Sequence, residues 1–236
     1  APPTLVAGLS AVLTFESRDA YNNLRPLGGD SFETFTTFEP APEAAAHDAA
    51  RALAAAEGAP AADDGGGGAE GGGWQTGDGA GSAPLLDELS GLYSVGFGGC
   101  RAGTLRLHVR LGGIAIEGSP FALRVLPAEP SAPNCSACGG GLLGGIAGQS
   151  LGMRVLLRDR YGNAVAADDS SGVALTLHGA SRVCGEVTLE ESHTLSGVLH
   201  ASAIATVSGR YYAHVTLDGE QVGGSPFALS VRSAAA

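Results

Sequence analysis

The sequence has few charged residues, and most of those that it has are acidic. Asp, Glu, Lys and Arg make up 16% of the 236 residues, the net charge is −11, and all 13 basic residues are arginine. A protein that binds nucleic acid or an anionic membrane surface needs a basic face for the phosphate groups. We therefore expect no nucleic-acid partner and no binding to an anionic membrane surface.

Long apolar runs are also missing. No run approaches the roughly 18 or more apolar residues that a membrane-spanning helix requires, so we expect no direct membrane insertion by this segment. The sequence begins without a methionine or a signal peptide. We therefore expect it to be part of a longer or processed protein.

Motifs that would carry chemistry lack the context that they need. The run Gly148–Gly152 matches the G-x-S-x-G nucleophile elbow, which requires a strand before it and a helix after it, whereas a glycine-rich turn precedes it and strand-like alternation follows. Asp19 and Asp159 begin D-x-Y-x-N turns with too few oxygens for calcium, so we interpret them as turn-capping residues. We expect no enzymatic activity and no catalytic, cofactor-binding or metal site.

One hexapeptide occurs twice without change. Gly-Ser-Pro-Phe-Ala-Leu stands at 118–123 and again at 224–229, 106 residues later. The turn at 18–23 corresponds to 158–163 with a larger shift of 140 residues. The difference, 140 − 106 = 34 residues, indicates extra chain in the first unit. We place this insertion at about 41–83, where the composition is low in complexity.

Alternating apolar residues flank both hexapeptides, as in Leu105, Leu107 and Val109 before the first copy. This period of two is typical of half-buried strands. Phe32, Phe35 and Phe38 break strict alternation, so we expect a bulge or twist there. Each unit offers six or seven short strands and no βαβ alternation, which predicts an all-β immunoglobulin-type sandwich.

These residues resemble the filamin-type immunoglobulin repeat. The similar motifs are Ala147-Gly148, 158–163, Ser208–Tyr211, Val215–Gly219 and Gly223–Phe227 in the second unit, and 24–32, 90–95 and 116–121 in the first. The resemblance implies two tandem immunoglobulin-like β-sandwich domains. We expect domain 1 at 1–127, a Pro-rich linker at 128–134 and domain 2 at 135–236.

The insertion at 41–83 has two parts. Residues 41–58 are rich in alanine, with Pro42 near the start and Gly58 at the end, which is compatible with a short helix. Residues 59–83 consist mostly of Gly, Ala and Asp. Because such a composition buries too little apolar surface to offset ordering entropy, we expect a flexible insertion within domain 1.

The resemblance implies a non-enzymatic structural and protein-recognition module. Similar repeats occur in cytoplasmic filamins and in surface proteins, which include plant and algal gamete adhesion and fusion proteins. The cysteines and the Ala/Gly bias favour an extracellular or cell-surface adhesion protein. Two alternatives stay open: a cytoplasmic filamin-like scaffold or actin cross-linker, and a carbohydrate-binding or hydrolase accessory module.

An even number of cysteines in a loop-rich β protein favours an oxidising compartment. From the strand order of a seven-stranded sandwich we expect a Cys100–Cys135 disulfide. We also expect Cys138–Cys184, although the strand order alone does not place these two at one end of the sandwich, and four unpaired thiols are the alternative. Cys135-x-x-Cys138 has no second pair, so we expect no zinc. Asn134 begins an N-x-S glycosylation sequon.

The resemblance also implies a place for partners. Filamin-type repeats resemble one another in offering an edge strand formed after the D-x-Y-x-N turn. In the second unit this strand contains Val173, Leu175 and Leu177. We expect protein partners to bind there by adding a strand, with a covered or idle edge as the alternative.

Overall fold

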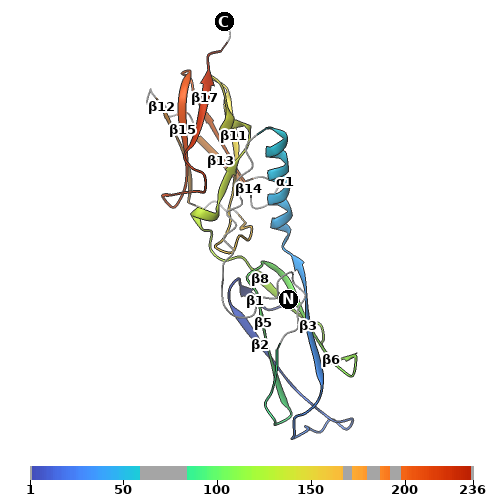
Figure 1. The fold of residues 1–236 in the computed structure, drawn as a ribbon. Helices are drawn as coiled ribbons and strands as arrows, with labels where there is room; N and C mark the ends of the chain where they lie inside the picture. Colours follow the sequence, from blue (N-terminus) through green and yellow to red (C-terminus); the bar gives the residue numbers. More distant parts are fainter. Residues whose placement is uncertain (1, 59–83, 167–171, 180–186, 192–197, 235–236) are drawn as a thin grey trace. The chain divides into compact units, whose positions relative to one another are not determined.

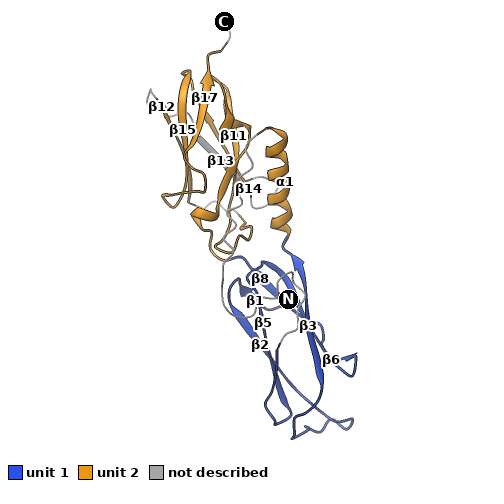
Figure 2. Ribbon diagram, viewed as in Figure 1, with its two compact units in different colours: residues 1–41, 70–127 blue, residues 42–69, 128–236 orange. Residues whose placement is uncertain are grey.

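The computed structural model describes residues 2–58, 84–166, 172–179, 187–191 and 198–234. The chain divides into two compact units, each of which contains two β-sheets (Figures 1 and 2). Unit 1 comprises residues 1–41 and 70–127, and unit 2 comprises residues 42–69 and 128–236. Among the described residues, no helix is both long enough and apolar enough to span a membrane.

Unit 1 is a sandwich of two sheets in which most neighbouring strands are antiparallel. One sheet has the order β1-β8-β6-β3, with β7 paired to β6, and the other has the order β2-β5-β4. The strands are β1 (Thr4–Val6), β2 (Ser10–Glu16), β3 (Phe32–Pro40), β4 (Leu85–Asp87), β5 (Leu92–Gly98), β6 (Gly103–Leu111), β7 (Ile114–Ala115) and β8 (Phe121–Leu126).

Unit 2 repeats this order with one additional strand. Its sheets are β10-β17-β15-β12, with β16 paired to β15, and β13-β14-β11-β9. The strands are β9 (Ser136–Cys138), β10 (Gly144–Ile146), β11 (Ser150–Leu156), β12 (Val173–Gly179), β13 (Val187–Glu191), β14 (Val198–Ile204), β15 (Gly209–Leu217), β16 (Glu220–Gln221) and β17 (Phe227–Arg232). Two 3₁₀ turns, η2 (Ala132–Asn134) and η3 (Gly140–Leu143), flank β9. The two expected immunoglobulin-like sandwiches are confirmed.

The repeated hexapeptide closes the same hairpin in both units. Ser119 Oγ accepts a hydrogen bond from Val109 N at 3.0 Å, and Ser225 Oγ accepts one from Val215 N at 2.9 Å. The preceding Gly118 adopts a φ of 81°, which a residue with a Cβ rarely adopts. The proline follows the serine and stands just before the last strand, because a residue without an N–H cannot donate within a ladder.

The sandwich interiors follow the predicted alternation. In unit 2 one cluster joins both sheets and includes Met153, Val155, Leu177, Val215 and Val231. In unit 1 one cluster consists of the buried side chains of Val95, Leu107 and Val109, against which partly buried aromatic and aliphatic residues pack. Tyr93 of the same unit is also fully buried.

The bulge that we expected in the Phe-rich segment is not present. The strand β3 pairs with β6 in one unbroken register from Phe32 to Pro40. Phe35 instead lies on the opposite face from the buried Thr36, where its ring stacks on His108 with a centroid separation of 4.5 Å. The break in the apolar pattern therefore comes from an aromatic residue outside the core.

The alanine-rich segment forms a helix, as its sequence predicted. Helix α1 (Pro42–Ala56) begins at a proline, and the chain turns after it at Gly58, which has a φ of 77°. In sequence α1 interrupts unit 1 between β3 and β4. In the structure it belongs to unit 2 and packs on the sheet that contains β14 (Figure 2), which the sequence did not predict.

Candidate interaction surfaces

Strand β12 lies where the sequence analysis placed a partner-binding edge. It pairs with β15, and within the described residues no strand pairs with its other side. The side chains of Leu175 and Leu177 are buried at 4% and 8% exposure, and Val173 packs against the same core. The three predicted residues therefore anchor the edge strand, and its backbone and outward side chains are what a partner can contact.

The outward residues of β12 are Ala174, Thr176 and His178, and all three are exposed. The His178 ring lies 4.6 Å from that of His214 on β15. His214 Nδ1 is in turn 3.1 Å from Gln221 Nε2. This edge is thus polar on its outer face and apolar on its inner face, as an edge strand that can accept a further strand requires.

The D-x-Y-x-N turns are built by their own side chains. Asp159 is fully buried, and its Oδ1 accepts hydrogen bonds from Tyr161 N at 2.8 Å and Asn163 N at 2.9 Å. Its Oδ2 accepts from Ala128 N at 2.9 Å. Asp19 makes the equivalent turn, and the hydrogen bond from Asn23 lowers the pKa of its carboxyl group. These carboxylate oxygens serve backbone donors, which fits the turn interpretation rather than a calcium site.

The described residues contain no disulfide, so the expected Cys100–Cys135 bridge is not formed in the structure. Cys135 lies in the core of unit 2, where its sulfur accepts a hydrogen bond from Arg158 N at 3.3 Å, and burial raises the pKa of its thiol. Cys184 lies outside the described residues, so the Cys138–Cys184 pairing stays a prediction.

The sequon asparagine has a structural role. Asn134 Nδ2 donates a hydrogen bond to the carbonyl oxygen of Asp159 at 2.9 Å. This nitrogen is the atom to which a glycan would be attached. Glycosylation of Asn134 stays a prediction, and it would leave this nitrogen with one N–H to donate.

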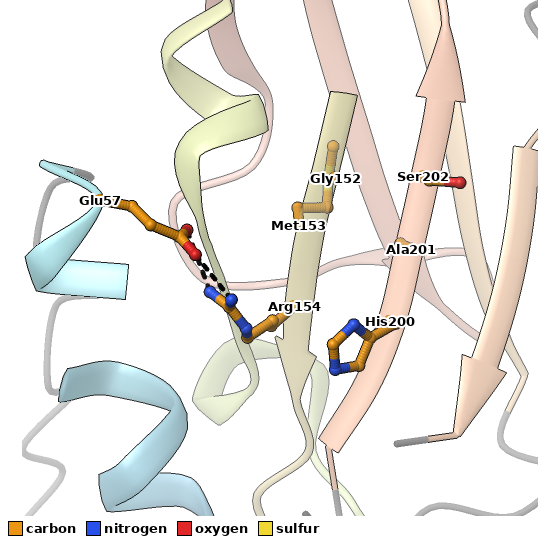
Figure 3. Close-up of a pocket in the computed structure, with 7 residues that line it drawn as sticks. All are labelled: Glu57, Gly152, Met153, Arg154, His200, Ala201 and Ser202. Atoms are coloured by element: carbon orange, nitrogen blue, oxygen red, sulfur yellow. Dashed lines mark hydrogen bonds and ion pairs between the residues drawn. The ribbon is translucent and has the colours of Figure 1, made fainter. Parts of the chain in front are cut away.

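A second surface lies on the outer face of the β13-β14-β11-β9 sheet, and the sequence analysis missed it. Glu57, just after α1, forms a two-pronged ion pair with Arg154 of β11, with Nη2–Oε1 at 2.7 Å and Nη1–Oε2 at 3.1 Å (Figure 3). Glu57 Oε2 also accepts a hydrogen bond from Gly140 N at 2.9 Å. The hydrogen bond from Arg154 lowers the pKa of Glu57, and the same bond raises that of Arg154.

Beside this ion pair is a hollow of about 340 Å³. We call it the Arg154 hollow. Figure 3 shows Arg154 and His200 side by side above the sheet, as their cross-strand pairing requires. The lining residues come from the turn after α1 and from β11 and β14, and they are Glu57, Gly152, Met153, Arg154, His200, Ala201 and Ser202.

Alanine explains why this surface was missed. The residues of α1 that face the sheet are His47, Ala50 and Ala54. Other alanines of the same helix are exposed. The buried face is therefore not distinguished from the exposed face by more apolar residues. The only sequence signal is the spacing of three and four residues between His47, Ala50 and Ala54, which an alanine-rich helix shows on every side.

The comparisons with known proteins can now be set beside this geometry. A search of curated proteins found no match. Invasin, described as a bacterial integrin-binding protein, is 14% identical with a TM-score of 0.55, over 98% of this chain and 38% of its own. InvD of Yersinia pseudotuberculosis is 17% identical with a TM-score of 0.52, over 99% of this chain and 56% of its own. The chain thus spans about half or less of the length of these two proteins, and at such identities the likeness shows the fold alone.

One solved filamin domain covers a single unit. The Lin-41 filamin domain is 23% identical over 44% of this chain and 98% of its own, with a TM-score of 0.38. The family model described as Filamin/ABP280 repeat matches residues 129–228. Those residues contain η2, the strands β9 to β16, the first two residues of β17 and the D-x-Y-x-N turn. Residues 129–228 of this chain are therefore similar to a filamin-type immunoglobulin-like repeat.

Proposed function

We propose that the chain is a structural and protein-recognition module of a cell-surface or extracellular adhesion protein, and that it binds a protein partner by strand addition at β12. The observation that carries the proposal is that no strand among the described residues pairs with the outer side of β12, in a segment that matches a filamin-type repeat. A strand added there would make main-chain hydrogen bonds to β12, and its side chains would meet Thr176 and His178. Adhesion in gametes would be one form of this function.

The proposal is tested at the outward residues, because replacing the buried Leu175 would damage the core instead. Thr176→Lys places a charge on the edge, a change that blocks strand pairing in many proteins. Ser230→Lys is the matched control, since Ser230 is also exposed but lies on β17 between two other strands of the same sheet. The measurement is recovery of surface-labelled proteins from the native cells by each purified variant.

We expect Thr176→Lys to lose at least tenfold of the bound partner and Ser230→Lys to bind as the original chain does. Equal recovery by both variants, in chains with unchanged far-UV circular dichroism, would rule out strand addition at β12. Peptide mapping of native material without reduction tests the compartment separately, because disulfides form in oxidising compartments.

A cytoplasmic scaffold is a second candidate, and the burial of Cys135 in the core of unit 2 favours it, because a thiol in a core behaves as a small apolar residue. Disulfides are rare in the cytosol. Recovery of all four cysteines as thiols from native material would support the scaffold and would leave the strand-addition mechanism untouched.

A further inference from the structure

Helix α1 covers an apolar strip on the outer face of the β13-β14-β11-β9 sheet. The strip consists of Cys138, Leu156 and Val198, one from each of three neighbouring strands, and each is at most 1% exposed. Ala50 and Ala54 of α1 complete this cluster, which is separate from the main core of unit 2. An outward apolar strip of this kind needs a cover, because exposed apolar patches mark interaction surfaces.

The cover that α1 provides is a weak one. An alanine buries a single methyl group, so each contact contributes far less than a buried leucine or phenylalanine would. Leu53, the largest apolar side chain of α1, is 49% exposed. The helix thus meets a strip of larger apolar residues with the smallest apolar residue available.

Recognition at the end of the helix is by contrast specific. Arg154 holds the Glu57 carboxylate with two parallel N–H donors, and Gly140 N adds a third. Such two-pronged pairing selects a carboxylate by geometry as well as by charge. The Arg154 hollow lies next to this pair over Gly152, where no side chain fills the space, so a longer side chain than the alanines that α1 turns toward the sheet has room there.

We propose that this face is a binding surface for an amphipathic helix of a protein partner, and that α1 is its internal occupant. The partner helix brings apolar residues to the positions of His47, Ala50 and Ala54 and an acidic residue to the position of Glu57. It replaces α1 on the strip and keeps the ion pair with Arg154. The binding mode is that of a helix laid into a groove, on the sheet opposite to the one that contains β12.

The first test uses a fluorescent peptide with the sequence of residues 41–58 and the full chain. The internal helix competes at a high effective concentration, so the original chain should bind the peptide weakly. Ala50→Glu removes α1 from the strip, whereas Ala52→Glu makes the same change at an exposed position of the same helix. We expect fluorescence anisotropy to show at least tenfold tighter binding for Ala50→Glu than for Ala52→Glu or the original chain.

A second peptide with glutamine in place of Glu57 tests the ion pair. It should bind the Ala50→Glu chain at least threefold more weakly than the first peptide does. This difference should disappear when Arg154→Gln is added to the chain. Equal binding of the peptide to the Ala50→Glu and Ala52→Glu chains, or equal binding by a scrambled peptide, would overturn the proposal.

A further measurement keeps the test valid if Ala50→Glu does not fold. Cys138 lies under α1 whereas Cys135 lies in the sandwich core, so thiol labelling of the reduced chain distinguishes release of α1 from unfolding of unit 2. The milder Glu57→Gln should raise the labelling rate of Cys138 about fivefold without changing that of Cys135, and excess peptide should lower it again. Rates that rise together, or that do not respond to the peptide, would show that α1 is a fixed part of unit 2.

Discussion

The two units have the same strand order but stabilise it with different chemistry. Unit 2 has a continuous aliphatic core that joins both sheets. Unit 1 has few fully buried aliphatic residues, and around them the rings of Phe15, Phe32 and Tyr93 contact one another with centroid separations of 4.8–5.7 Å. One strand arrangement thus tolerates either core, provided that the inward positions stay apolar.

Polar anchoring also differs between the units. In unit 1, Asp30 accepts a hydrogen bond from Ser17 Oγ at 2.6 Å, pairs with Arg25 and contacts the Tyr93 hydroxyl. In unit 2, the hydroxyl of Tyr211 on β15 donates to the carbonyl oxygen of Val207 at 2.7 Å, four residues earlier, as in the tyrosine corner of immunoglobulin folds. Unit 1 depends more on a charged network, and unit 2 on backbone and aliphatic contacts.

The strongest test of this comparison replaces the core residue at one equivalent position of each unit by alanine. The shift of 106 residues places Tyr93 at the position of Leu199, and both are buried. We expect Tyr93→Ala to destabilise unit 1 by about 3–5 kcal/mol and Leu199→Ala to destabilise unit 2 by about 2–4 kcal/mol. Urea unfolding followed by hydrogen exchange assigns each loss to its unit, and a larger loss in unit 2 would contradict the comparison.

The charged network of unit 1 gives the second test. Asp30→Asn should cost unit 1 about 2 kcal/mol at pH 7, because hydrogen bonds to charged groups are worth about 1.5–3 kcal/mol. The hydrogen bond from Ser17 lowers the pKa of Asp30 in the folded state. Its stabilisation is therefore present above the ordinary aspartate pKa of about 3.9 and is lost as the pH falls through the lower folded value.

Urea unfolding at pH 7 and at pH 3 measures this dependence. The stability of unit 1 should fall between these pH values more in the original chain than in Asp30→Asn, whereas unit 2 should respond equally in both chains. Identical pH dependence of unit 1 in the two chains would show that Asp30 does not contribute through its charge.

The smallest expected effect concerns α1. Glu57→Gln removes the charge of a partly exposed ion pair with Arg154, worth up to about 1 kcal/mol. We expect the melting temperature of unit 2 to fall by about 3–6 °C and that of unit 1 to stay unchanged. A loss confined to unit 1 would show that the helix stabilises the unit into which it is inserted in the sequence.

Much of this architecture was predictable because it follows from local rules. Alternation of apolar residues defines strands. The serine of the Ser-Pro-Phe motif accepts a hydrogen bond from a residue ten positions away, and within the D-x-Y-x-N turns the aspartate accepts from residues two and four positions away. Asp19 and Asp159 perform this function in both turns. The edge strand with Leu175, by contrast, was placed from the resemblance to filamin-type repeats, and its inward orientation makes the outer residues the candidates for contact.

The sequence by itself determined the two sandwiches and their repeat, since periodicity and turn chemistry act between near neighbours, and it was compatible with a helix at 42–56. Only the tertiary structure decided where α1 packs and that Glu57 meets Arg154, which lie 97 residues apart in the sequence. It also placed Cys138 on the outer face of the sheet under α1 and Cys135 in the core. Alanine lacks a size or polarity that distinguishes one helix face from another, so the choice depended on the shape and charge of a distant sheet.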